Sequence, residues 1–104
     1  MKAKFGLTRV DMHDLERSFQ KFKKIKKVVL FGSRAMGNFK PYSDIDLAIV
    51  ESKVSFSDTL QAHSEIEEET NIPYFIDLLD YRTITNEELK KHIDEYGKII
   101  YQKK

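Results

Sequence analysis

Two aspartates, Asp44 and Asp46, flank Ile45 at the mouth of an apolar run that ends at Val50. Side chains two positions apart in a strand point to the same face of the sheet, so the two carboxylates would share one face. Aspartate is disfavoured in strands, and two carboxylates about 4–5 Å apart repel each other by roughly 3–4 kcal/mol at an effective dielectric near 20. The pair therefore indicates either a solvated strand end, with Asp44 capping a turn, or a site that binds a cation.

The pair Gly32-Ser33 follows another short apolar run, over residues 28–31. Glycine lets the backbone turn tightly and approach a ligand closely. Backbone amides at the start of a following helical turn, together with the Ser33 hydroxyl, would form a cradle for phosphate. Gly-Ser pairs are also ordinary turn residues, so this pair by itself favours a simple turn.

A third acidic residue, Asp77, lies inside the apolar run 74–79. A lone charge in a buried strand is costly unless a partner compensates it, so Asp77 should pair either with a lysine or with a metal ion. Asp80, at the exit of the same run, is an alternative, although aspartates are common in turns. If the three runs are neighbouring strands, three carboxylates converge beside the Gly32-Ser33 turn. Oxygen ligands without His or Cys beside them favour Mg²⁺ or Mn²⁺ over zinc.

The apolar pattern predicts the elements that must hold these residues. Strands are expected over 28–31, 44–50 and 74–79, with a further edge strand over 99–101. Helices are expected from a Thr8 cap into 21–27, from Ser55 or Ser57 to about Thr70, and from a capping box of Thr85 and Glu88 to Gly97. Residues 33–43 should be mostly loop, opening with at most one helical turn. This order predicts an α/β (α+β) fold in which helices pack against one small mixed sheet.

Apolar spacing also predicts which side of each helix faces the sheet. The expected inward residues are Met12, Leu15, Phe19 and Phe22 in the first helix, Leu60 and Ile66 in the second, and Leu89, Ile93 and Tyr96 in the third. The three histidines, His13, His63 and His92, lie in three different helices with no ligand spacing between them, so no metal role is expected of them.

Composition limits the classes of function. A length of 104 residues predicts a single domain, 1–104, and 40% hydrophobic with 34% charged residues is typical of a soluble globular protein. The formal net charge of +1 supplies no bulk attraction to nucleic acid or to an anionic membrane. Without cysteine, neither a disulfide nor a thiolate metal site can form. No segment approaches the roughly 18 consecutive apolar residues of a membrane span, so a cytoplasmic location is expected.

Gly32-Ser33, ten intervening residues and then Asp44-Ile45-Asp46 resemble the GS-x10-DxD signature of the polymerase-β-type nucleotidyltransferase superfamily. The fuller string GSRAMGNFKPYSDIDLAIV is similar to the minimal nucleotidyltransferases, the MNT group. The resemblance runs from about residue 28 to 50 and resumes over 74–79. Members of this group are short proteins, often paired with a HEPN-domain protein as antitoxin and toxin, and some are thought to AMPylate that toxin on tyrosine.

The resemblance implies a polymerase-beta-like nucleotidyltransferase fold and a role for each matching residue. Gly32 and Ser33 would hold the outer phosphates of ATP, with Arg34 as a further candidate contact. Asp44 and Asp46 would bridge two Mg²⁺ ions, for which Mn²⁺ is an alternative. Asp77 would ligand the ion nearest the attacking group and could act as a base. An acceptor hydroxyl would attack the α-phosphorus, and pyrophosphate would leave.

Three functions are compatible with these features. The favoured one is a Mg²⁺-dependent transferase that moves AMP from ATP to a hydroxyl of a HEPN-type partner and thereby acts as an antitoxin. The second is a non-catalytic module that neutralises a partner by covering its surface. The third is a transferase acting on a small molecule, which is less favoured because no second domain shapes a pocket for the acceptor. A HEPN-type partner or a second copy of the chain is expected to complete the cleft.

Overall fold

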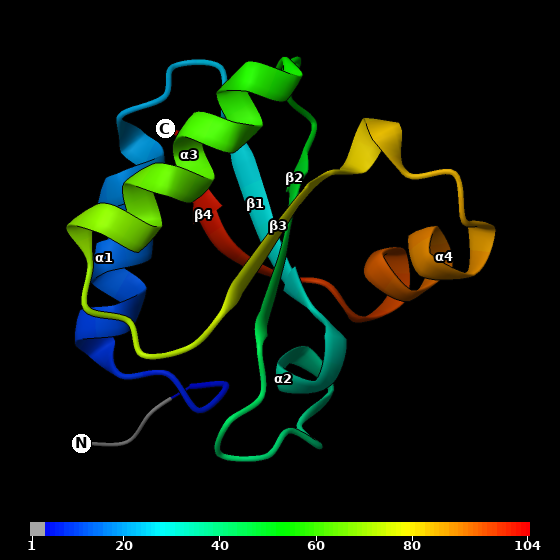
Figure 1. Cartoon of the computed structure of the whole chain (residues 1–104). Coiled ribbons are helices and arrows are strands. Elements are labelled where there is room, and N and C mark those ends of the chain that lie inside the picture. Colours follow the sequence, from blue (N-terminus) through cyan, green and yellow to red (C-terminus); the bar gives the residue numbers. More distant parts are fainter. Residues whose placement is uncertain (1–3) are drawn as a thin grey trace.

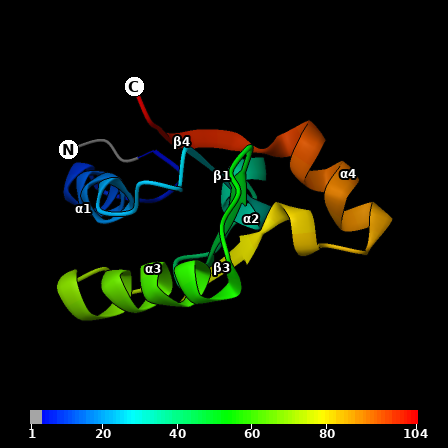
Figure 2. The same ribbon diagram turned by 90° about the horizontal axis from the view of Figure 1, so that it is seen from above.

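The computed structural model describes residues 4–104 as a four-stranded mixed sheet with helices on both faces (Figures 1 and 2). The elements in chain order are α1 (Arg9–Gln20), β1 (Lys27–Phe31), α2 (Gly32–Met36), β2 (Ile45–Val50), α3 (Phe56–Glu69), β3 (Ile76–Asp80), the 3-10 helix η1 (Tyr81–Thr83), α4 (Glu87–Tyr96) and β4 (Lys98–Gln102). The predicted fold class is therefore confirmed. Of the helices in the described part of the chain, none combines the length and apolar character needed to span a bilayer.

The sheet has the strand order β3-β2-β1-β4. β1 pairs antiparallel with both β2 and β4, whereas β3 runs parallel to β2. A parallel pair needs a crossover connection, which α3 supplies between β2 and β3. The three strands predicted to carry the candidate residues are therefore neighbours, with β2 in the middle, and β4 forms the predicted edge.

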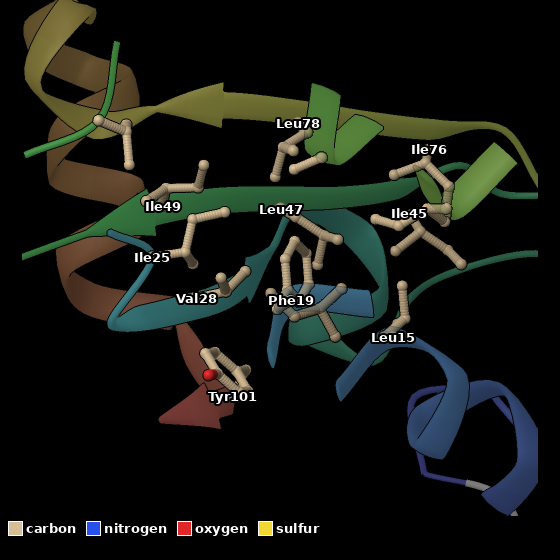
Figure 3. Close-up of a cluster of buried hydrophobic side chains, with 14 of the residues drawn as sticks. Leu15, Phe19, Ile25, Val28, Ile45, Leu47, Ile49, Ile76, Leu78 and Tyr101 are labelled. Atoms are coloured by element: carbon tan, nitrogen blue, oxygen red, sulfur yellow. The ribbon is translucent and has the colours of Figure 1, made fainter. Parts of the chain in front are cut away.

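Strand alternation separates two hydrophobic clusters. The larger one lies between the sheet and helices α1 and α3 (Figure 3), and includes Leu15, Phe19, Val28, Leu30, Ile45, Leu47, Ile49, Ile66, Ile76, Leu78 and Tyr101. The smaller one lies on the opposite face, which α4 covers (Figure 2), and comprises Val29, Phe31, Ala48, Ile84 and Ile93. Asp46 and Asp77 alternate with the residues of the larger cluster, so they belong to the α4 face of the sheet.

Capping residues determine where the helices begin. Thr8 forms a reciprocal capping box with Asp11 at α1, and Ser55 forms one with Asp58 at α3, as the sequence predicts. The capping box predicted at Thr85 is wrong by one residue: the side chain of Asn86 accepts a 3.0 Å hydrogen bond from the Leu89 amide. Asparagine is at least as good an N-cap as threonine, and its oxygen reaches the amide three positions on.

Two inward positions were predicted wrongly. Leu60 is 51% exposed, and Ala62 with Ile66 forms the buried side of α3. Residues six apart in a helix are separated by about 240° around the axis, so Leu60 and Ile66 cannot share one face. Tyr96, in the last position of α4, is 41% exposed, whereas Ile93 is buried as predicted.

Candidate functional site

The parallel pairing of β2 with β3 places two of the candidate aspartates side by side. Asp46 and Asp77 are partners in the strand register, and Phe31 of β1 is opposite Asp46 on the other side. Neighbouring strands lie about 4.8 Å apart, so the two carboxylates start from adjacent backbone positions on one face. Asp77 is exposed, and the burial predicted for it is wrong, because β3 is an edge strand and its α4 face is open at this point. Water therefore reduces the cost of placing two like charges together.

Asp44 adds a third negative charge from the segment that enters β2. It is exposed and lies just outside the strand, two residues before Asp46. Burial raises the pKa of the Asp46 carboxyl above its ordinary value, and the negative charges of Asp77 and then Asp44 raise this pKa further, whereas the positive charges of Arg34 and, when its ring is protonated, His92 lower it. The charges of Asp77 and Asp44 thus act on the Asp46 carboxyl, and Asp77 is also its partner in the strand register.

The donor chemistry of this cluster fits Mg²⁺ or Mn²⁺, which prefer carboxylate oxygens. Within residues 4–104, however, no three His, Cys, Asp or Glu side chains are gathered closely enough to form a complete metal site. The sheet fixes the backbone of Asp46 and Asp77, while Asp44 belongs to an exposed loop. The arrangement is therefore a pair of fixed carboxylates with a third nearby, rather than a preassembled cage.

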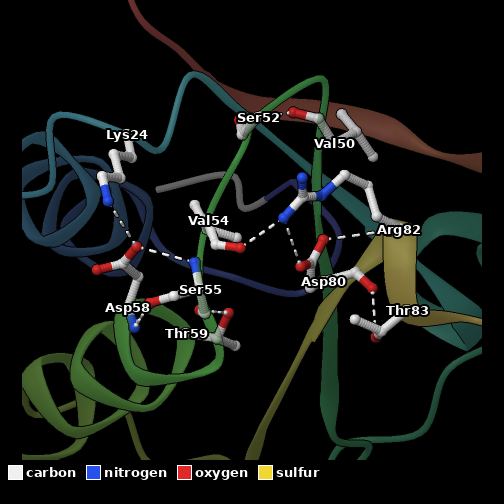
Figure 4. Close-up of polar contacts among 10 residues, drawn as sticks. All are labelled: Lys24, Val50, Ser52, Val54, Ser55, Asp58, Thr59, Asp80, Arg82 and Thr83. Atoms are coloured by element: carbon white, nitrogen blue, oxygen red, sulfur yellow. Dashed lines mark hydrogen bonds and ion pairs between the residues drawn. The ribbon is translucent and has the colours of Figure 1, made fainter.

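Asp80, the alternative to Asp77, has a different environment. It lies three residues further along β3, and alternation places it on the α3 face of the sheet, where it is buried. Its carboxylate accepts hydrogen bonds from the Arg82 amide at 3.1 Å and the Arg82 guanidinium at 3.5 Å (Figure 4). The same guanidinium donates to the Val54 carbonyl. Asp80 therefore caps η1 and fixes Arg82, and it is not part of the carboxylate cluster.

Gly32 is packed directly against Asp46. β1 ends at Phe31, and α2 begins at Gly32, which has φ +76°. A Cβ at this position would lie 2.2 Å from Oδ2 of Asp46, so any side chain here would force the Asp46 carboxylate to move. Only glycine satisfies both the left-handed backbone and this close approach. Ser33, which is half-buried, directly follows this contact in the chain, and its role at the site stays a prediction.

The structure does not place Arg34 in the site. Its side chain is 1% exposed, and Nε and Nη2 donate to the Ser43 carbonyl at 3.1 and 2.7 Å, while Nη1 donates to the Phe5 carbonyl at 2.8 Å. The guanidinium also lies over the Tyr74 ring at 4.3 Å. A contact between Arg34 and a phosphate would require these bonds to break. Arg34 instead ties the turn after β1 to Ser43, the residue that precedes Asp44.

We expect Arg34→Lys to lower the free energy of unfolding by about 2–4 kcal/mol. The ammonium group of lysine cannot donate to both the Ser43 and Phe5 carbonyls as the planar guanidinium does, so a buried carbonyl is left unpaired. Urea denaturation measures the loss. The matched control is Arg17→Lys, since Arg17 is largely exposed and makes a single 3.3 Å contact with Asp14. Equal stabilities of the two variants would contradict the scaffold role of Arg34.

His92 is a residue of this site that sequence reasoning missed. Its Nε2 accepts a 2.9 Å hydrogen bond from the Gly32 amide, and its ring meets the Phe31 ring edge-on at 6.0 Å between centroids. The only available signal was its position three residues after Leu89, on the side of α4 that faces the sheet. The spacing of the histidines argues against a shared metal ion, but it gives no information about a hydrogen bond from the backbone to His92.

The raised pKa of Asp46 means that ionisation of this carboxyl lowers the stability of the folded chain. The folded chain binds this proton more tightly than the unfolded chain does. Its stability therefore falls as the pH rises from about 3.8 through the pKa of Asp46 in the folded state, and the loss persists at neutral pH. We therefore expect Asp46→Asn to raise the melting temperature at pH 7 in EDTA. The gain should shrink as the pH is lowered towards 3.8. A lower melting temperature for the variant at every pH would show that the Asp46 carboxylate is stabilising instead.

Comparison with known proteins identifies relatives of this chain. The profile of the family described as "Polymerase beta, Nucleotidyltransferase" matches residues 13–104. Over 73 residues the chain is 36% identical to the Haemophilus influenzae protein named probable protein adenylyltransferase MntA, an alignment that covers 70% of this chain and 63% of that protein. The chain thus spans less than two thirds of the length of this curated relative.

Solved structures share the fold. A toxin–antitoxin crystal structure with AMP-PNP superimposes with a TM-score of 0.69 at 19% identity, covering 89% of this chain and 74% of that one. The MNT antitoxin in complex with a tri-AMPylated Shewanella oneidensis HEPN toxin superimposes with a TM-score of 0.66 at 16% identity, covering 93% and 74%. Because the family profile extends over most of the sequence and the sheet matches these structures, the chain belongs to the polymerase beta nucleotidyltransferase family.

Proposed function

We propose that this chain is a Mg²⁺-dependent nucleotidyltransferase that transfers AMP from ATP to a hydroxyl of a HEPN-type partner protein and acts as its antitoxin. The observation that carries the proposal is the juxtaposition of Asp46 and Asp77 across β2 and β3, with the Gly32 backbone packed against Asp46. The named activity of the Haemophilus influenzae relative supports adenylyl transfer, and the HEPN toxin in the Shewanella oneidensis complex supports the class of partner.

Each residue of the site has a distinct proposed task. Asp44, Asp46 and Asp77 hold Mg²⁺, which supplies neutralisation of phosphate charge when bound. The Ser33 hydroxyl binds a phosphate oxygen of ATP, and Gly32 leaves room for Asp46. Asp77, exposed at the edge of the sheet, accepts the proton of the acceptor hydroxyl. The acceptor oxygen then forms a bond to the α-phosphorus while the bond to the bridging oxygen breaks and pyrophosphate leaves.

The openness of the site favours an acceptor that belongs to another macromolecule. Asp44 and Asp77 are both exposed, and Tyr42 in the loop before Asp44 is 90% exposed. The two most prominent cavities in residues 4–104 lie elsewhere, beside α1 and between β1 and α4, and neither is lined by Asp44, Asp46 or Asp77. A partner surface would both cover the carboxylates and present the hydroxyl.

The proposal is tested by the intact mass of a HEPN-type candidate partner protein after incubation with this chain, ATP and Mg²⁺. The expected result is the addition of one or more AMP units with the wild type and none with Asp44→Asn/Asp46→Asn. A stable complex without added mass would indicate a non-catalytic antitoxin, and the transferase proposal would be abandoned.

A further inference from the structure

We infer that His92 is a positioning residue: its imidazole holds the Gly32 amide from across the sheet face and thereby fixes the turn that places Ser33 beside Asp46. The hydrogen bond itself is independent of any activity, whereas the consequence for nucleotide binding rests on the proposed function. His92 lies in α4, which packs on the same face of the sheet as the carboxylate cluster (Figure 2).

The imidazole ring is held from two sides. The Phe31 ring meets it edge-on, and the Tyr96 ring lies 5.3 Å away between centroids, tilted by 37°. These two contacts orient Nε2 towards the Gly32 amide at 2.9 Å. Since Nε2 accepts this bond, the lone pair on Nε2 must be free and the ring proton must be on Nδ1. The bond joins residues sixty positions apart in the sequence, so it locks α4 to the turn after β1.

Arg34 anchors the far side of this turn, but no local side chain binds its first amides. Phe31, the residue before α2, has an apolar side chain and provides no capping hydrogen bond. Gly32 has φ +76°, and glycine in this region has more conformational freedom than any other residue. His92 therefore satisfies the amide of the first residue of α2, from another element of the fold.

This assignment changes the task of Gly32. The resemblance to the nucleotidyltransferase signature implies that Gly32 binds phosphate, yet in the structure its amide is already occupied by His92. The first hydroxyl donor on the turn is that of Ser33, which has no side-chain hydrogen-bond partner among residues 4–104. Gly32 thus contributes shape and a fixed backbone, and Ser33 contributes the ligand contact.

The direct test is NMR of the ¹⁵N-labelled full chain. In the wild type we expect a scalar coupling between the Gly32 amide nitrogen and His92 Nε2, and slow exchange of the Gly32 amide proton. His92→Phe keeps the aromatic packing but lacks the acceptor, so this exchange should accelerate about tenfold. His13→Phe is the matched control, because His13 is exposed on α1 and should leave Gly32 exchange unchanged. Absence of the coupling in the wild type overturns the inference even if the variant fails to fold.

The functional arm measures binding of AMP-PNP with Mg²⁺ by calorimetry, well below the melting temperatures. We expect His92→Phe to weaken binding about tenfold, as loss of one positioning hydrogen bond would, and His92→Gln, which retains an acceptor, to recover part of the affinity. Wild-type affinity in His92→Phe contradicts the inference. If the wild type itself does not bind the nucleotide, the proposed function fails, and the coupling and exchange measurements still decide whether His92 positions Gly32.

Discussion

The Asp46→Asn variant is expected to transfer AMP at least about 10³-fold more slowly than the wild type. Asp46 pairs with Asp77 in the strand register and its Oδ2 faces the Gly32 backbone, so under the proposed function it is the carboxylate that would link the cation to the phosphate turn. A bound cation supplies several kcal/mol of charge stabilisation, and each 1.36 kcal/mol corresponds to a factor of ten in rate. Pyrophosphate release under saturating ATP measures the loss.

Asp80→Asn is the matched control for this experiment. It makes the same chemical change on β3, but on the opposite face of the sheet, where Asp80 binds Arg82. This variant should lose stability and keep its rate at a temperature where it remains folded. Asp46→Asn should do the reverse, with a higher melting temperature at neutral pH and little activity. A lower transfer rate in Asp80→Asn, with the rate of Asp46→Asn unchanged, would show that the catalytic carboxylate lies on the other face of the sheet.

Gly32→Ala is expected to be as damaging as removal of the carboxylate. The new Cβ would meet Asp46 Oδ2 at 2.2 Å, and the residue would have to keep φ +76°. The left-handed backbone costs about 1–2 kcal/mol and the displaced side chain adds to this, so the loss of stability should total about 2–5 kcal/mol. Since Asp46 must also move, transfer activity should fall by a larger factor than the folded fraction.

Gly37→Ala separates the effect of the left-handed backbone from the effect of the contact with Asp46. Gly37 ends α2 with φ +88°, yet no atom lies within 4 Å of a Cβ placed there. The variant should therefore lose only about 1–2 kcal/mol for the backbone and retain its activity. Chemical denaturation and pyrophosphate release, measured on both variants, give the comparison. Equal activity losses in the two glycine variants would show that contact with Asp46 is unimportant.

Local patterns were sufficient to predict the sheet and most helix starts. Runs of β-branched and aromatic residues marked the strands, and Thr8 and Ser55 marked two helices, because both signals depend only on neighbours in the sequence. Strand adjacency stayed a condition at the level of the sequence, and the order β3-β2-β1 fulfils it. The pairing of Asp46 with Asp77 is a consequence of that adjacency; their roles in catalysis stay predictions.

Long-range contacts explain what the sequence could not show. Arg34 has the same surroundings in sequence as a phosphate-binding arginine, but its partners are Phe5, Ser43 and Tyr74, which the fold alone brings together. Likewise the 2.9 Å bond from Gly32 to His92 spans two elements with no shared pattern. The exposure of Asp77 depends on β3 being an edge strand, which its apolar composition conceals.

Under the proposed function, the carboxylates of β2 and β3 and the turn after β1 form one metal–nucleotide site. Addition of Mn²⁺, a paramagnetic substitute for Mg²⁺, with AMP-PNP to the ¹⁵N-labelled chain tests it most directly, because amide signals near the ion broaden. We expect selective broadening of the amide signals of Ser33, Asp44, Asp46 and Asp77. This broadening should be lost in Asp46→Asn. Broadening centred on the glutamates 67–69 at the end of α3, unchanged in the variant, would contradict it.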